Sequence, residues 1–160
     1  MDTFTLFHTL LSLIELVAGF VLVAQLLGSR VSTLWTGIFF VSAVLTSATG
    51  FGFKAPFPLP SHIVGILSLI VLAVAILGLY KFHLAGAWRW IYAVCVAVAV
   101  YFDTFVAVAQ LFMKVPVFKA LAPTQSEPPF AIAQIIVLLV FAGLIYSAVK
   151  KFHPGVAAAH

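Results

Sequence analysis

The chain has 160 residues, of which 64% are hydrophobic and only 8% are charged, and its mean hydropathy is +1.24. Soluble domains carry about 25% charged residues, so this composition excludes a soluble globular domain and indicates an integral membrane protein. The formal net charge of +4 comes from basic residues scattered at the ends of apolar segments. Such scattering is a signal of membrane topology, and it differs from the clustered basic patch of a nucleic-acid-binding protein.

Five apolar segments are long enough to cross a bilayer, since about 20 helical residues rising about 1.5 Å each suffice. Charge, glycine or proline bounds each segment, and no polar linker is long enough to hold a second domain. The sequence therefore predicts an all-α fold: a polytopic integral membrane protein in which residues 1–160 form one bundle of five transmembrane helices. The predicted spans are residues 4–27, 33–53, 62–80, 87–113 and 130–149.

The first predicted span opens with Asp2 and has no lysine or arginine ahead of its apolar run. A signal peptide would have a basic start, so we expect a genuine membrane span here. Within it, His8, Ser12, Glu15 and Gly19 are spaced i, i+4, i+7 and i+11. This spacing places them on one helical face, which we expect to point into the bundle.

The second predicted span carries Ser42, Thr46 and Thr49 on one face by the same helical spacing. The connection that follows, residues 51–62, interleaves three prolines with phenylalanines. Proline fixes the backbone and disfavours a helical residue before it, so this connection is predicted to be extended and stiff.

The fourth predicted span carries Asp103 near its middle, with Gln110 on the same face two turns further along. Insertion scales put the cost of a mid-membrane carboxylate at roughly 2.5 to 3.5 kcal/mol, so such an acid indicates a functional site. The single cysteine, Cys95, lies within an apolar run of the same span. A disulfide framework or a thiol mechanism is therefore not expected.

The connection before the last span ends in Ser126, Glu127, Pro128 and Pro129. Serine is a favoured N-cap, an acid interacts well with the helix dipole, and prolines fit where the first amides have no partner. The pattern predicts that Ser126 caps the last helix.

Counting lysine and arginine on each side of the predicted bundle gives its orientation. One side carries Lys54, Lys114 and Lys119, and the other carries Arg30, Lys81, Arg89, Lys150 and Lys151. This bias favours an N-terminus outside and a C-terminus in the cytoplasm; in a bacterial inner (cytoplasmic) membrane the N-terminus would be periplasmic. Trp88 and Trp90 with Tyr92 are predicted to form an aromatic anchor at the cytoplasmic interface.

Three strings in the chain are SATGFGF at residues 47–53, GAWRWIY at 86–92 and LAPTQSEPPF at 121–130. They resemble strings of an uncharacterised family of small bacterial inner-membrane proteins. The resemblance would cover most of the chain. It implies a helical inner-membrane protein, and it implies no activity, ligand or site residue.

The polar residues of the spans gather in one half of the predicted bundle. The outer third would hold His8, Thr49, His62, Gln110 and Gln134, and one or two turns deeper would lie Glu15, Thr46 and Asp103. The cytoplasmic half is mostly valine, leucine, isoleucine and alanine. This asymmetry predicts a polar pocket that opens outward.

Such a pocket favours binding of a hydrophobic redox ligand. His8 and His62 come from different spans at similar depth, so they could be the axial ligands of a haem b iron, or hydrogen-bond a quinone. A single histidine of this kind is, however, more often an interfacial residue bonded to a loop carbonyl.

Two further site chemistries fit the same residues. Glu15 and Asp103 could relay protons in a small proton-coupled transporter or channel, because two carboxylates in one low-dielectric pocket cannot both ionise cheaply. Alternatively Asp103 is a structural acid that holds helices together. The other possible chemistry is a metal site, in which His8, Glu15, His62 and Asp103 together bind one ion.

The lipid bilayer is the expected partner, and no nucleic acid is expected. Gly143 and Ser147 form one small-xxx-small pair in the last span, which would allow close packing in a homo-oligomer. A non-catalytic subunit of a larger membrane complex also fits this sequence.

Overall fold

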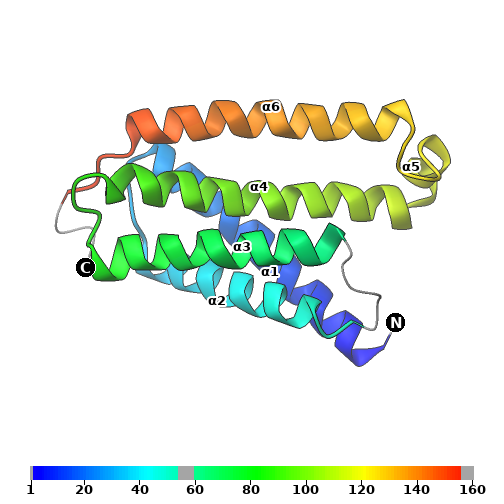
Figure 1. Cartoon of the computed structure of the whole chain (residues 1–160), viewed down its shortest axis with the longest axis horizontal. Coiled ribbons are helices and arrows are strands. Elements are labelled where there is room, and N and C mark those ends of the chain that lie inside the picture. The colour runs from blue at the N-terminus through cyan, green and yellow to red at the C-terminus, as the bar shows by residue number, and fades with distance from the viewer. Residues whose placement is uncertain (1, 54–59, 156–160) are drawn as a thin grey trace.

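The computed structural model describes residues 2–53 and 60–155, and these residues form helices joined by turns (Figure 1). The elements in chain order are α1 (Thr3–Leu27), α2 (Thr33–Gly50), α3 (Pro60–Ile76), the π-helical turn η1 (Leu77–Lys81), α4 (Trp88–Lys114), α5 (Pro116–Leu121) and α6 (Pro128–Lys151). Five helices, counting α3 and η1 as one, are long and apolar enough to cross a membrane. The predicted all-α bundle of five spans is confirmed.

The long helices alternate in direction, so residues 2 and 155, the first and last described residues, lie at opposite ends of the bundle (Figure 1). We call the end that holds the start of α1, the end of α2 and α5 the N-end. The opposite end, which holds the α1–α2 connection and residues 152–155, is the C-end. Helix α4 lies centrally and packs against α1, α3 and α6, while α1 also packs against α2.

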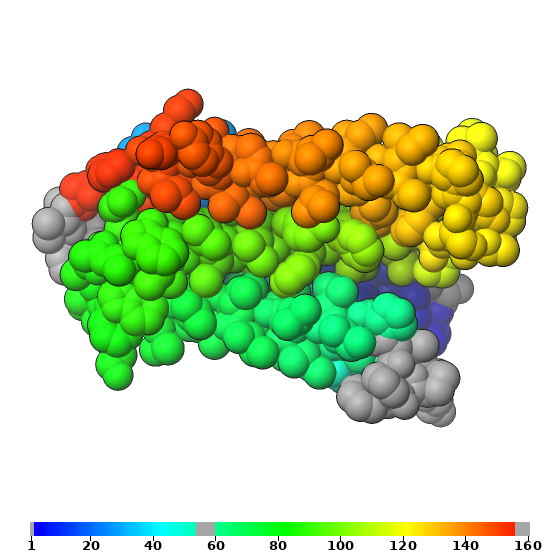
Figure 2. All heavy atoms as spheres, turned by 45° about the horizontal axis from the view of Figure 1, so that its top comes forward, coloured from blue at the N-terminus to red at the C-terminus, as the bar shows by residue number. Residues whose placement is uncertain are grey.

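The two halves of the bundle are packed differently. Most buried apolar side chains lie in the C-end half: Leu22, Val23, Leu26, Phe39, Phe40, Leu72, Leu79, Tyr92, Val96, Val100 and Phe152. In the N-end half, all ten α4 residues from 101 to 110 are only half-buried. Figure 2 shows α6, α4 and α3 side by side, with atoms of α1, in blue, visible between α3 and α4 toward the N-end.

A glycine sets the approach of α1 to α4. A Cβ placed on Gly19 would lie 2.8 Å from Cγ2 of Val100 and 3.2 Å from Cε2 of Phe39. Real Cβ atoms do not come so close to other carbons, so any larger residue would push these helices apart. Because Gly19 lies one turn beyond Glu15, it also holds α1 near the stretch of α4 that carries Asp103.

Polar contacts lock the C-end. The Arg89 guanidinium donates to the carbonyls of Val149, at 3.2 Å, and of Phe152, at 2.6 Å, and so caps α6. The backbone N–H of His153 donates to Ser29 Oγ at 2.6 Å. Lysine and arginine near the C-terminus of a helix can satisfy its last carbonyls in this way.

Two predictions of local structure are wrong. The N-cap of α6 is Glu127, not Ser126. An N-cap side chain accepts from the second or third helical amide, and for Ser126 these positions are Pro128 and Pro129, which have no N–H. The Glu127 carboxylate instead accepts from Thr124 Oγ1 at 2.8 Å.

The second wrong prediction concerns the aromatic anchor. Trp90 is 44% exposed, as an interfacial residue should be, but Tyr92 is only 2% exposed. Its ring packs against Phe152, with centroids 5.7 Å apart. Tyr92 therefore belongs to the core.

The span boundaries differ from prediction by up to three residues at each end: α2 ends at Gly50, and α3 and α6 each begin at a proline. Proline is tolerated at the first helical position, so Pro60 and Pro128 extend the helices outward. Helix α5 was not predicted. The predicted stiff connection falls largely on residues 54–59, outside the described residues.

Candidate functional site

The central feature of the site is a contact between two carboxyl groups inside the bundle. Glu15 of α1 and Asp103 of α4 lie within hydrogen-bonding reach of each other. Glu15 is 2% exposed, and Asp103 Oδ2 is fully buried. Two adjacent carboxylates in a low-dielectric interior repel strongly, whereas one proton held between them turns the repulsion into a hydrogen bond. The arrangement is suited to holding or exchanging a proton.

Unpartnered oxygens surround this carboxyl pair. The Thr46 side chain on α2 faces Glu15. Thr46 Oγ1 and Asp103 Oδ2 are both buried, and neither has a well-formed hydrogen bond within residues 2–53 and 60–155. A buried polar atom without a partner costs about 1–3 kcal/mol, so such atoms need an explanation. Here they indicate a place where a further polar group can bind.

His8 lies closer to the N-end and joins α1 to α2. Its Nδ1 is 2.8 Å from Thr49 Oγ1, and the Thr49 hydroxyl lies 2.6 Å from the Leu45 carbonyl, to which it donates. Since a hydroxyl has one proton, His8 Nδ1–H is the donor to Thr49, which leaves the lone pair on Nε2. The ring of Phe53 packs edge-on against His8, with centroids 4.9 Å apart.

Whereas His8 is half-buried, His62, at the start of α3, is buried at the N-end. Its ring stacks on Phe51, with centroids 5.5 Å apart and planes inclined by 15°. The two histidines therefore pack against neighbouring residues, Phe51 and Phe53, at the end of α2. These two phenylalanines were not predicted as site residues. Their position directly after the span that carries Thr46 and Thr49 on one face could have indicated that they lie near the polar residues.

Two glutamines complete the polar lining of the N-end half. Gln134 of α6 is buried and its Nε2 donates to the Phe105 carbonyl at 3.0 Å. The side-chain oxygens of Gln134 and Gln110 are buried and have no hydrogen-bond partner in the described part of the chain. Gln125, not predicted as a site residue, donates to the Ala109 carbonyl at 2.7 Å, and so ties the connection after α5 to α4.

The structure brings together only part of the predicted site. Glu15, Thr46 and Asp103 meet, and His8 meets Thr49. No three His, Cys, Asp or Glu side chains among the described residues are close enough to hold one metal ion. The mixed metal site predicted from two histidines and two acids is therefore not assembled, because the histidines lie nearer the N-end than the acids.

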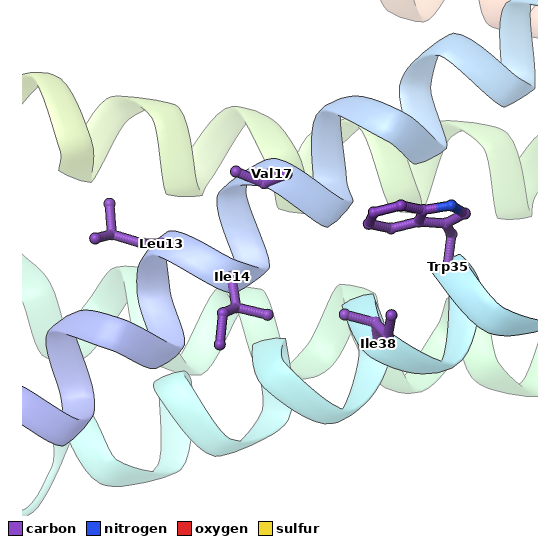
Figure 3. Close-up of a pocket in the computed structure, with 5 residues that line it drawn as sticks. All are labelled: Leu13, Ile14, Val17, Trp35 and Ile38. Carbon is purple, nitrogen blue, oxygen red and sulfur yellow. The ribbon is translucent and has the colours of Figure 1, made fainter.

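Two shallow hollows of the described surface are lined by apolar side chains. One, of about 380 Å³, is a groove between α1 and α2 lined by Leu13, Ile14, Val17, Trp35 and Ile38 (Figure 3). A second, of about 320 Å³, lies between α2 and α3 and is lined by Phe40, Val41, Val44, Leu45 and Ile76. Neither contains a residue of the predicted polar pocket, and their linings suit lipid chains.

Comparisons of the chain with protein-family models, with curated proteins and with solved structures give no match. The functional argument therefore depends on the geometry of the carboxyl pair and the polar residues around it.

Proposed function

We propose that this protein binds a hydrophobic redox ligand of the quinone class at the Glu15–Asp103 pair. The observation that carries the proposal is the contact of two carboxyl groups in the middle of an apolar bundle, beside buried oxygens that have no hydrogen-bond partner among the described residues. An intramembrane acid pair is costly and is a functional-site hypothesis by default.

The chemistry of the pair matches both redox states of such a ligand. A quinone presents carbonyl oxygens, which accept hydrogen bonds from a protonated carboxyl group. A quinol presents hydroxyl groups, which donate to an ionised carboxylate or to Thr46 Oγ1. Since quinone reduction takes up protons, a pair that exists in two protonation states serves both forms. The apolar tail would lie among the apolar side chains and the lipid.

The cellular orientation is part of the proposal. The sequence count of five lysine and arginine residues on the C-terminal side against three on the other favours a cytoplasmic C-terminus. In a bacterial inner membrane the N-end would then face the periplasm. A cytoplasmic reporter fused after His160 should be active. Alkaline phosphatase activity from that fusion would reverse the orientation.

Binding can be tested directly on detergent-purified protein. A short-tailed benzoquinone should bind with an affinity that falls as the pH rises, because carboxyl protonation supplies the donor. Asp103→Asn should remove this pH dependence, whereas Ser42→Ala, a matched change at a buried hydroxyl on α2, should preserve it. If wild-type protein bound neither the quinone nor the quinol, the ligand proposal would fail and a non-catalytic subunit role would be favoured.

Haem b is the second candidate, and one observation favours it. The His8–Thr49 contact leaves the Nε2 lone pair of His8 available, and a metal-ligating histidine typically donates its other N–H in this way. The purified protein would then show a Soret band, lost in His8→Ala and in His62→Ala but kept in His83→Ala. A protein without a visible spectrum would exclude this candidate.

Proton-coupled transport is the third candidate. The same carboxyl pair could carry protons across a cycle, provided that the apolar C-end half opens during it. Asp103→Asn and Glu15→Gln would each abolish proton-driven flux, because an amide cannot release a proton at an accessible pH. Flux that survives both substitutions would exclude this role.

A further inference from the structure

A line of polar side chains joins the carboxyl pair to the N-end. We call it the α1–α2 seam: His8, Ser12 and Glu15 on α1, with Thr46 and Thr49 on α2. The two helices meet across it twice, through His8 and Thr49 near the N-end and through Glu15 and Thr46 deeper in the bundle. Glu15 lies seven positions after His8, and a helix rises about 1.5 Å per residue, so the seam is about 10 Å long.

The hydroxyl oxygens of the seam are placed to accept hydrogen bonds, including those from a bound water. Ser12 Oγ donates to the Thr9 carbonyl at 2.8 Å, and Thr49 Oγ1 donates to the Leu45 carbonyl. Their hydrogens are thus committed, while oxygen lone pairs remain. Thr46 Oγ1, at the deep end, is buried without a partner among the described residues. A bound water needs two to four polar partners, and the seam offers them along its length.

The seam stops at the carboxyl pair. Beyond Glu15, residues 16–24 of α1 are all apolar. The next hydroxyl on α2 is that of Ser42, which is committed to the carbonyls of Ile38, at 2.6 Å, and Phe39, at 3.1 Å. Gly19 is closely packed against Val100 and Phe39 just beyond the pair. Toward the C-end, α1 and α2 therefore provide a packed and mostly apolar core, in which the further buried hydroxyl on α2 is that of Thr36.

Few ionisable groups face the pair. Helix α2 has none. On α4 the ionisable residues besides Asp103 are Arg89, Tyr92 and Cys95 toward the C-end, Tyr101, whose ring packs against Phe141 of α6 with centroids 5.7 Å apart, and Lys114 at the N-end. On α6 the ionisable residues are Tyr146, Lys150 and Lys151, all at the C-end. None of the lysine or arginine residues of α4 and α6 therefore lies at the depth of the pair, and the nearest base along the seam is His8.

We propose that the Glu15–Asp103 pair holds one shared proton and exchanges it with the N-end side alone, along the α1–α2 seam. The inference deepens the proposed function, because this is the proton with which the pair would hydrogen-bond to a carbonyl oxygen of a quinone-class ligand. It assigns Ser12 and Thr46 as positioning residues for proton transfer.

Infrared spectroscopy of the protein in lipid vesicles tests the shared proton. A buried protonated carboxyl group gives a carbonyl stretch that shifts when H₂O is replaced by D₂O. Wild-type protein should show such a band at neutral pH, and Asp103→Asn should remove or displace it. A wild-type spectrum without this band would overturn the shared proton.

The rate of the same shift tests the seam. Ser12→Ala and Thr46→Val should each slow deuterium exchange by on the order of tenfold, the rate effect of one lost hydrogen bond. Ser42→Ala, one turn beyond the pair on α2, is the matched control and should exchange as fast as wild type. Equal rates in all four folded proteins would overturn the seam.

A separate experiment tests whether protons reach the pair from the N-end face alone. In vesicles that hold the protein in one known orientation, a pH jump on the N-end face should change the band, and a jump on the C-end face should not. An equal response from both faces would overturn one-sided access. Quinone binding is measured separately, so its absence alongside slowed exchange in the seam variants would reject the ligand proposal and keep the proton path.

Discussion

The C-end half and the N-end half of this bundle are built from the same five helices, yet they differ in what they bury. The C-end half encloses mostly phenylalanine, leucine and valine side chains, with Thr36 Oγ1 as its unpartnered buried oxygen among the described residues, and Arg89 caps α6 there. The N-end half encloses two carboxyl groups, two histidines and two glutamines, with several oxygens unpartnered among the described residues. The packing of the C-end half therefore stabilises the fold, while the N-end half bears most of the free-energy cost of burying polar groups.

This division follows from energetics. Each unpartnered buried polar atom costs about 1–3 kcal/mol, and a folded protein has only about 5–15 kcal/mol in total. The buried polar groups of the N-end half are tolerated because close packing in the C-end half holds the helices together. In a membrane such packing between helices, rather than exclusion from water, drives their association. Substitutions in the two halves should accordingly change different properties.

The largest loss of stability is expected from Phe39→Ala. Phe39 is 0% exposed and packs beside Gly19, so its removal leaves a cavity in the C-end half. The cost should be about 3 kcal/mol or more, measured by unfolding in mixed micelles. Leu139→Ala on α6, where the side chain is 65% exposed, is the control and should be nearly neutral. Similar losses for both variants would contradict the placement of the core.

Gly19→Val tests the close approach of α1 to α4. The added side chain would meet Val100 and Phe39, and overpacking of this kind costs about 1–3 kcal/mol. Because separation of α1 from α4 would also separate the carboxyl groups, the infrared band of the shared proton should shift. Gly143→Val, where a Cβ meets nothing within 4 Å, is the matched control. An unchanged melting temperature in Gly19→Val would show that the two helices are not in contact there.

Asp103→Asn should separate stability from function. The amide keeps the shape of the side chain and can still hydrogen-bond, so the free energy of unfolding should stay within about 1 kcal/mol of wild type. The pH dependence of ligand binding should disappear, and Glu15→Gln should act in the same direction. Retention of full pH-dependent binding in Asp103→Asn would demote this acid to a packing residue.

The smallest effect concerns Glu127, outside the membrane spans. Hydrogen bonds from the Thr124 hydroxyl, and from the amides of Thr124 and Ser126, hold the pKa of this carboxyl below its usual 4.5. The contacts are therefore complete above pH 4.5 and are lost as the pH falls through the lower, folded value. The amide NMR signals of Thr124 and Ser126 should titrate with a midpoint below 4.5 and should not titrate in Glu127→Gln. A midpoint at or above 4.5 would contradict these contacts.

The sequence by itself determined the five spans, the all-α class and the set of polar residues that would enter the bundle. Length, hydropathy and helical spacing are local properties, and a lone acid such as Asp103 in an apolar run has few places to go other than inward. The sequence also indicated that the polar residues would share one half, because depth along a helix follows directly from residue number.

Only the tertiary structure decided which polar residues meet. The rotation and separation of helices depend on side-chain packing, here on Gly19 against Val100, and no spacing within one span encodes it. That packing pairs Glu15 with Asp103 and leaves the histidines against Phe51 and Phe53. It also buries Tyr92, since its face of α4 turns toward Phe152, a residue 60 positions away in the chain.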